Sequence, residues 1–170
     1  MYFEFYAVGH PPSVNKASAI KKDSWKAIVR AECAATIASG TQTLMPLPYP
    51  KSSIVKVYFF PTTKQYFDLD NGLKYTLDGI NQFTAGNDAK RLGLVPTPHT
   101  LITDDRNVAR IVAERVVLKP GASIVARIGA VQMFLNAYAA ALAAAVPGAP
   151  KPYGVAIKVE PFIKRHGPKW

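Results

Sequence analysis

Cysteine, acidic side chains and long apolar runs are all scarce in this chain of 170 residues. The single cysteine, Cys33, excludes an internal disulfide and fits a reducing compartment, so we expect a cytoplasmic protein. Cys33 falls inside a helical pattern and has no histidine near it in the sequence. That context predicts a buried structural thiol rather than a nucleophile.

No stretch of the sequence has the pattern of a membrane-spanning helix. The most apolar run, residues 130–146, is mostly alanine and is interrupted by Gln132 and Asn136. The beginning of the chain lacks a cationic start followed by a leucine-rich segment, so no secretory signal is predicted. We therefore expect no membrane partner.

Acidic residues are outnumbered, with 11 Asp and Glu against 21 Lys and Arg, which gives a formal net charge of +10. Such a balance predicts attraction to polyanions, with nucleic acid as the first candidate and an acidic membrane as the second. The basic residues recur along the chain, and they could form a phosphate-contacting surface or simply solvated faces. They include Lys21, Lys22, Lys26, Arg30, Lys90, Arg91, Lys164, Arg165 and Lys169.

Hydrophobic patterning predicts one domain of the α/β class, with a mixed α+β sheet and flanking helices. Residues 83–100 contain Gly, Asn and Pro at short intervals and predict an irregular loop. One buried stripe of the middle helix is expected to hold Leu73, Leu77 and Ile80. We expect strands at residues 2–8, 53–60, 108–118 and 155–162, and helices at 19–39, after Asp70 and at 131–146, the last being alanine-rich and followed by a basic tail.

Carboxylates are concentrated in the stretch "KQYFDLDNGLKYTLDG", residues 64–79. Asp68 and Asp70 are two residues apart at the end of a predicted strand, so their side chains point to the same face. Asp70 then takes the N-cap position of a helix, and Lys74 and Asp78 follow at spacings of four. This spacing places Asp70, Lys74 and Asp78 in one line along the helix.

A second acidic pair, Asp104 and Asp105, lies immediately before a later predicted strand. If the sheet brings the start of that strand beside Asp68, three carboxylates converge on one point. Oxygen ligands without cysteine or histidine suit Mg²⁺ or Mn²⁺, and a bound cation would relieve the repulsion among them. On a basic surface such a metal could activate water for phosphodiester cleavage. Lys74 could then lie against the scissile phosphate.

Simpler roles remain open for the same residues. Asp70 could merely cap a helix, a common role worth about 1 kcal/mol. Lys74 could be an ordinary surface partner of Asp70 and Asp78. Asn15 and Lys16 could contact substrate or finish a turn.

Three blocks of sequence resemble a known family of nucleases. "PPSVNK" stands at residues 11–16, "DLDNGLKYTLDGI" at residues 68–80 and "DDRNV" at residues 104–108. In this order they resemble the RusA-like Holliday junction resolvases. The core of that family reads Asp-Leu-Asp-Asn, then Lys, then an Asp-Asp pair, and a Pro-Pro-Ser-x-Asn segment follows its first strand.

The resemblance implies a homodimeric, Mg²⁺-dependent crossover junction endodeoxyribonuclease, with Mn²⁺ as a possible substitute. Enzymes of this family bind four-way DNA junctions in recombination and repair and make paired, symmetric nicks. By position, the metal-binding and catalytic acids would be Asp68, Asp70 and Asp105. Lys74 would be the essential catalytic lysine, and Asp78 matches an acid of the same helix. A bacterial or phage origin is also implied.

The resemblance implies a single RusA-like endonuclease domain over residues 1–170, and either "GVAIKVEPF" or "SIVARI" could be its closing strand. Two other functions are compatible with the residues. One is a non-catalytic basic DNA-binding protein, and the other is a divalent-metal phosphodiesterase acting on other nucleic acids.

Overall fold

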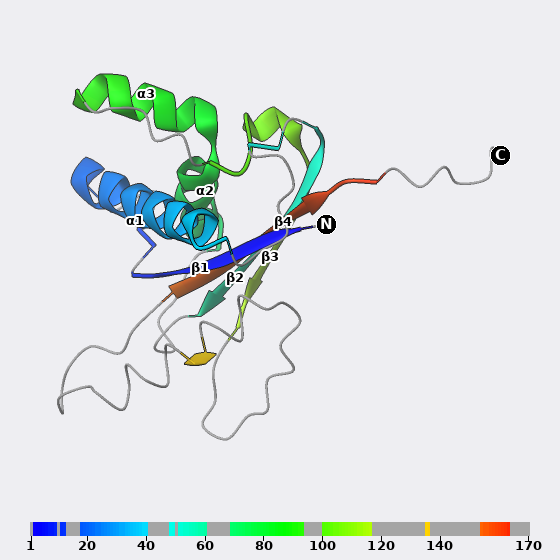
Figure 1. Ribbon diagram of the computed structural model, residues 1–170. Helices are drawn as coiled ribbons and strands as arrows, with labels where there is room; N and C mark the ends of the chain where they lie inside the picture. The colour runs from blue at the N-terminus through cyan, green and yellow to red at the C-terminus, as the bar shows by residue number, and fades with distance from the viewer. Residues whose placement is uncertain are drawn as a thin grey trace, which may run out of the picture.

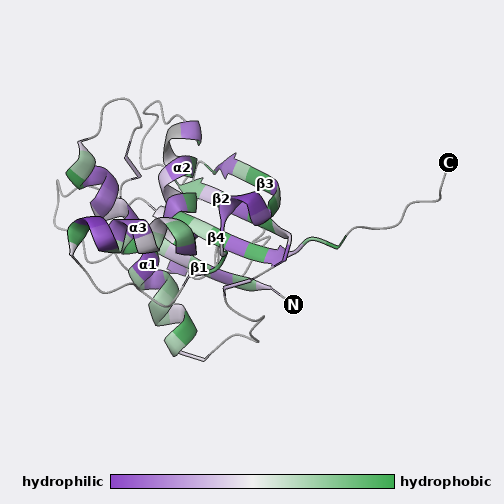
Figure 2. Cartoon of the chain, turned by 90° about the horizontal axis from the view of Figure 1, so that it is seen from above, coloured by the Kyte–Doolittle hydropathy of each residue, from purple (hydrophilic) through white to green (hydrophobic). Residues whose placement is uncertain are grey.

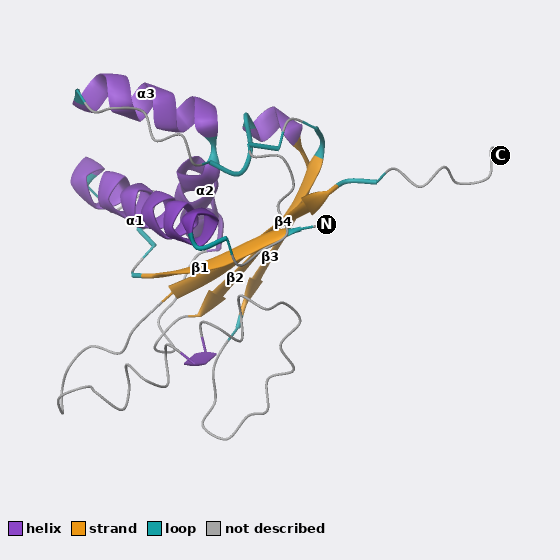
Figure 3. Cartoon of the chain, viewed as in Figure 1, coloured by secondary structure: helices purple, strands orange, loops and turns teal. Residues whose placement is uncertain are grey.

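A computed structural model describes residues 2–9, 11–12, 18–40, 48–49, 51–60, 69–93, 100–116, 135–136 and 154–163 (Figure 1). The elements, coloured by type in Figure 3, are β1 (Phe3–Val8), α1 (Ala19–Ala38), β2 (Ser53–Phe60), α2 (Leu69–Ile80), α3 (Gln82–Leu92), the 3-10 helix η1 (Asp105–Asn107), β3 (Val108–Arg115) and β4 (Gly154–Pro161).

The four strands form one sheet in the order β1-β4-β2-β3. β4 is antiparallel to both of its neighbours, β1 and β2, whereas β2 and β3 are parallel. This mixed sheet with its helices confirms the predicted fold class. The strand predicted at residues 53–60 is the inner strand β2, and β4, the last of the described strands, lies between β1 and β2.

Helices α1, α2 and α3 lie on the same side of the sheet (Figures 1 and 2). The strands turn alternate side chains to that side, and these are fully buried: Phe3 and Phe5 in β1, Val55, Val57 and Phe59 in β2, and Val155, Ile157 and Val159 in β4. The period of two follows from strand geometry. On the opposite side of the sheet Lys56 and Lys158 are cross-strand neighbours, while Tyr58, Phe60 and Ala156 of that side are buried.

Helix α1 packs directly against α2. Trp25 Nε1 donates a hydrogen bond of 3.1 Å to Thr76 Oγ1, and both side chains are buried. One turn further on, a Cβ added at Gly79 would lie 2.7 Å from Val29 Cγ1, so this approach requires glycine. Cys33 is fully buried on the same helix, which confirms the predicted structural thiol, and burial raises its pKa to about 12.

Helix α3 contradicts the predicted irregular loop over residues 83–92, whereas residues 94–99 of that loop lie outside the described part of the chain. Asn81 caps the helix by accepting a hydrogen bond from Thr84 N, and Gly93 ends it with a left-handed φ of 65°. Lys90 and Arg91 lie in the last turn, where positive charge is favourable to the helix dipole. Over residues 83–92 the prediction was wrong because it counted Gly86 and Asn87 as loop formers, although both lie inside the helix, and Gly93 is its C-cap.

Helix α2 begins two residues earlier than predicted, at Leu69, so Asp70 lies within its first turn rather than at the N-cap. Its most buried positions are Gly72, Tyr75, Thr76, Gly79 and Ile80, at the spacing of a stripe packed on α1 and the sheet. The leucines predicted for that stripe, Leu73 and Leu77, are only partly buried, although both pack against the core.

Several expectations fall outside the described residues. They concern the alanine-rich helix near 130–146, of which only residues 135–136 are described, the possible hairpin strand at 123–128, and the basic tail from 164 onward. Within the described part of the chain, none of the helices combines the length and the hydropathy needed to cross a membrane.

Candidate active site on helix α2

The exposed side of α2 carries two of the predicted catalytic residues. Among the α2 side chains that the structure describes, Asp70 and Lys74 are the exposed ones. They are four residues apart, which on a helix corresponds to one turn and a rise of about 6 Å. A carboxylate and an ammonium group are therefore presented side by side to solvent, while the other described side chains of the helix are buried or partly buried.

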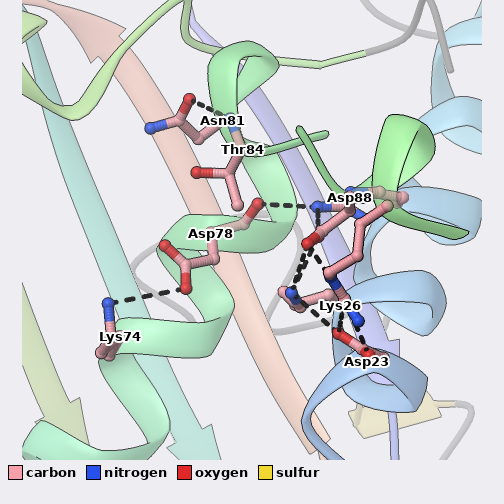
Figure 4. A network of polar contacts seen from close by, with 9 residues as sticks. Asp23, Lys26, Lys74, Asp78, Asn81, Thr84 and Asp88 are labelled. Atoms are coloured by element: carbon pink, nitrogen blue, oxygen red, sulfur yellow. Dashed lines mark hydrogen bonds and ion pairs between the residues drawn. The ribbon is translucent and has the colours of Figure 1, made fainter. Parts of the chain in front are cut away.

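Asp78 continues this line, as the sequence predicts. Its Oδ2 lies 3.7 Å from Lys74 Nζ, and the exposed fractions of the two side chains are 23% and 59% (Figure 4). Burial raises the pKa of the Asp78 carboxyl, and the nearby charge of Asp88 acts in the same direction, while Lys74 only partly offsets the effect. Asp78 is thus a desolvated carboxylate whose ion-pair partner is mostly in water.

The second acidic pair stands at η1, immediately before β3. Asp104 accepts hydrogen bonds from the backbone N and the guanidinium of Arg106, which hold the pKa of Asp104 well below its usual range. Asp105 is exposed. Two residues before Asp104, the backbone carbonyl of Ile102 accepts a hydrogen bond from Gln82 N, so this segment is bonded to the junction between α2 and α3. The structure thus assigns Asp104 to a local turn and leaves Asp105 accessible.

The predicted metal ligands are only partly described. Asp70 and Asp105 supply carboxylate oxygens of the kind that Mg²⁺ prefers. Asp68 lies outside the described residues, as do Asn15 and Lys16. Among the side chains that are described, no group of three Asp, Glu, His or Cys residues is close enough to hold a metal ion. The convergence of Asp68, Asp70 and Asp105 stays a prediction.

A network of buried charge joins α1 to α3 (Figure 4). Asp88 on α3 accepts hydrogen bonds from Lys26 Nζ at 2.9 Å and from Arg30 Nη2 at 2.7 Å. Asp23 lies 3.0 Å from the same Lys26 Nζ and accepts a further bond of 2.9 Å from Arg91. The hydrogen bonds and positive charges of these partners outweigh the effect of burial and lower the pKa values of both aspartates.

Three of the cations predicted for a phosphate-contacting surface are therefore paired with aspartates of the protein itself. Lys26 is 7% exposed, and Lys26, Arg30 and Arg91 each lie within ion-pair distance of an aspartate. The sequence offered no signal for the pairs between α1 and α3, because their members are about 60 positions apart in the chain. Only Asp23 with Lys26 and Asp88 with Arg91 stand at the local helical spacing of three.

Two lysines, one from α1 and one from α2, lie close to the ring of Tyr75. Lys22 Nζ lies 5.4 Å from the centroid of the Tyr75 ring, and Lys74 Nζ lies 6.0 Å from the same centroid. Tyr75 is 8% exposed, so the packing of α1 on α2 fixes its ring. The ring thus links a lysine of α1 with the lysine predicted to be catalytic, which the sequence did not indicate.

No protein-family model matches the chain, and no curated protein sequence matches it. The resemblance to the RusA-like resolvases therefore depends on the three sequence blocks and on the geometry of the residues in them.

Proposed function

We propose that this protein is a Mg²⁺-dependent, structure-selective endodeoxyribonuclease that resolves four-way DNA junctions by paired, symmetric nicks. The observation that carries the proposal is the exposure of Asp70 and Lys74 one turn apart on α2. These are the acid and the lysine of the block that resembles the RusA-like family. The accessible Asp105 before β3 and the net charge of +10 support a phosphodiester substrate.

The proposed roles follow from the chemistry of each side chain. Asp70 and Asp105, with Asp68, would hold the metal, which when bound would activate water and stabilise charge on the phosphate. The Lys74 ammonium would stabilise negative charge that develops on the phosphate, because its 59% exposed side chain leaves it accessible to a substrate. Asp78, at 3.7 Å, would limit where that ammonium can move.

Cleavage of a synthetic four-way junction in Mg²⁺ tests the proposal. We expect Asp70→Asn to reduce the cleavage rate by about a hundredfold or more while junction binding persists, because the substitution removes a metal ligand but no phosphate contact. The matched control is Asp23→Asn, which removes the same charge from α1, and it is expected to cleave like the wild type.

Each unexpected result of the cleavage assay would contradict a different part of the proposal. Wild type that binds junctions but never cuts them would contradict the enzyme proposal and favour a basic DNA-binding protein. Cleavage of linear duplex as fast as junction would contradict junction selectivity and favour a more general phosphodiesterase. Asp70→Asn that cuts at the wild-type rate would remove α2 from the active site.

A further inference from the structure

We infer that Lys22 and Lys74, held on either side of the contact between α1 and α2, together form a binding site for the backbone phosphates of a DNA strand. The inference rests on the proposed function for the identity of the polyanion. It adds a residue of α1 to the substrate-binding surface, to which neither the sequence blocks nor the predicted active site assigns a role.

The first observation is the pairing of like charges at one ring. Both ammonium groups lie within about 6 Å of the Tyr75 centroid, so they are at most about 11 Å apart. The ring face attracts each cation and offsets part of their mutual repulsion. A phosphate between or beside the two lysines would remove the rest of that repulsion.

The second observation is the contrast between Lys22 and the other cations of α1. Lys26 and Arg30 are neutralised by Asp88. Asp23, the acid next to Lys22 in the sequence, turns to Lys26 and Arg91 instead. Within the described residues no carboxylate lies within ion-pair distance of Lys22, and its aromatic neighbour carries no charge. Lys22 is thus positioned without a counter-ion among the described side chains.

The third observation is the rigidity of the platform under both lysines. The hydrogen bond from Trp25 to Thr76 and the close approach of Val29 to Gly79 fix α1 against α2. Since Lys22 precedes Trp25 by one turn, the position of its backbone relative to that of Lys74 is set by buried contacts. Binding of an anion therefore requires ordering of the two side chains but no rearrangement of the helices.

The type of contact follows from the burial of the ring. Tyr75 is 8% exposed, so it has no free face on which a base could stack. The two ammonium groups therefore contact backbone phosphates, which a protein binds without regard to sequence. Lys74 lies one turn from Asp70, so the strand bound here would run past the proposed metal ligands.

Fluorescence anisotropy with a labelled four-way junction, measured in EDTA so that no cleavage occurs, tests the site. Lys22→Gln is expected to weaken binding about five- to tenfold near 0.1 M salt and to reduce the slope of log K against log salt by about 1. The matched control is Lys21→Gln, which removes the same charge from the next position of α1. Because that position is turned about 100° around the helix, we expect less than about a twofold change.

Lys22→Arg keeps the charge and is expected to restore both the affinity and the salt slope, which also shows that α1 tolerates substitution here. Equal losses for Lys22→Gln and Lys21→Gln would overturn the inference, even if the wild type cuts junctions normally. Conversely, a loss specific to Lys22 in a protein that never cuts would support the site and contradict the nuclease. Failure of the wild type to bind DNA would overturn both.

Discussion

Asp88 is the residue whose ionisation matters most to the packing of α3 on α1. It is 8% exposed, and it receives Lys26 and Arg30, whose side chains are 9% and 13% exposed. Removing one partner of a buried ion pair leaves the remaining charge without compensation. We therefore predict that Asp88→Asn lowers the free energy of unfolding by about 2–4 kcal/mol in urea denaturation.

Asp23→Asn provides the matched control for this prediction, because Asp23 contacts Lys26 and Arg91, as Asp88 also does. Its side chain is 23% exposed against 12% for Asp88, so water can replace much of what is lost. We expect a cost of less than about 1 kcal/mol. Equal costs for the two variants would mean that burial does not determine the strength of the network.

The pH dependence of the Asp88 effect follows from the direction of its pKa shift. Burial raises the pKa of Asp88, but hydrogen bonds from Lys26 and Arg30 outweigh it, so the folded-state pKa lies below 3.8. Its stabilising contribution is therefore complete above that pH and is lost as the pH falls through the folded-state pKa. The difference between wild type and Asp88→Asn should stay constant from neutral pH to about 5 and shrink below about 4.

Local spacing was enough to predict that three charged residues of α2 share one side of the helix. The separation of four between Asp70, Lys74 and Asp78 gave both their common side and the contact of Lys74 with Asp78. The ring contact between Lys22 and Tyr75 was not predictable in this way. It depends on how α1 crosses α2, and that crossing depends on Gly79 admitting Val29.

At the scale of elements, three glycines of α2 and α3 have different structural roles. Gly86 lies inside α3 with open space where a Cβ would stand, so a side chain there would change only the helix propensity. Gly93 has equal space, but its φ of 65° is costly for any side chain. At Gly79 a Cβ would come within 2.7 Å of Val29.

Alanine substitutions at these positions should therefore differ in sign. We predict that Gly86→Ala stabilises the protein by about 0.5–1 kcal/mol, whereas Gly93→Ala destabilises it by about 1 kcal/mol. Gly79→Ala should cost about 1–3 kcal/mol through overpacking, and Val29→Ala in the same chain should recover part of that loss. Urea denaturation measures all four, and a stabilising Gly93→Ala would contradict the left-handed end of α3.

Most of the helices and strands were predictable from the sequence, and helix α3 is the exception. Strands β1, β2 and β4 and helix α1 followed from runs of apolar residues with a clear period. Helix α3 was missed because its sequence, "QFTAGNDAKRL", has few apolar residues and a glycine in the middle. The helix depends instead on its two caps and on the contacts of Asp88 with α1.

For the whole molecule, the pairing of acids with bases concentrates the excess of positive charge on fewer side chains. Several acids lie within ion-pair distance of a lysine or arginine, on both sides of the sheet: Asp23, Asp78, Asp88, Asp104 and Glu160. With a net charge of +10, the cations left outside these pairs determine where a polyanion can bind. Lys22 is one of them, which connects the charge of the whole chain to the site between α1 and α2.

Paired, symmetric nicks require two active sites related by a two-fold axis, so the proposed function also requires a homodimer. We predict that a mixture of equal parts wild type and Asp70→Asn, after subunit exchange, contains heterodimers that cut only one strand. On a supercoiled plasmid with an extruded cruciform, wild-type dimers give linear product and heterodimers give nicked circles. Random exchange should yield about twice as many heterodimers as wild-type dimers. A mixture that yields linear product alone, or a protein that sediments as a monomer while cutting both strands, would contradict the dimeric mechanism.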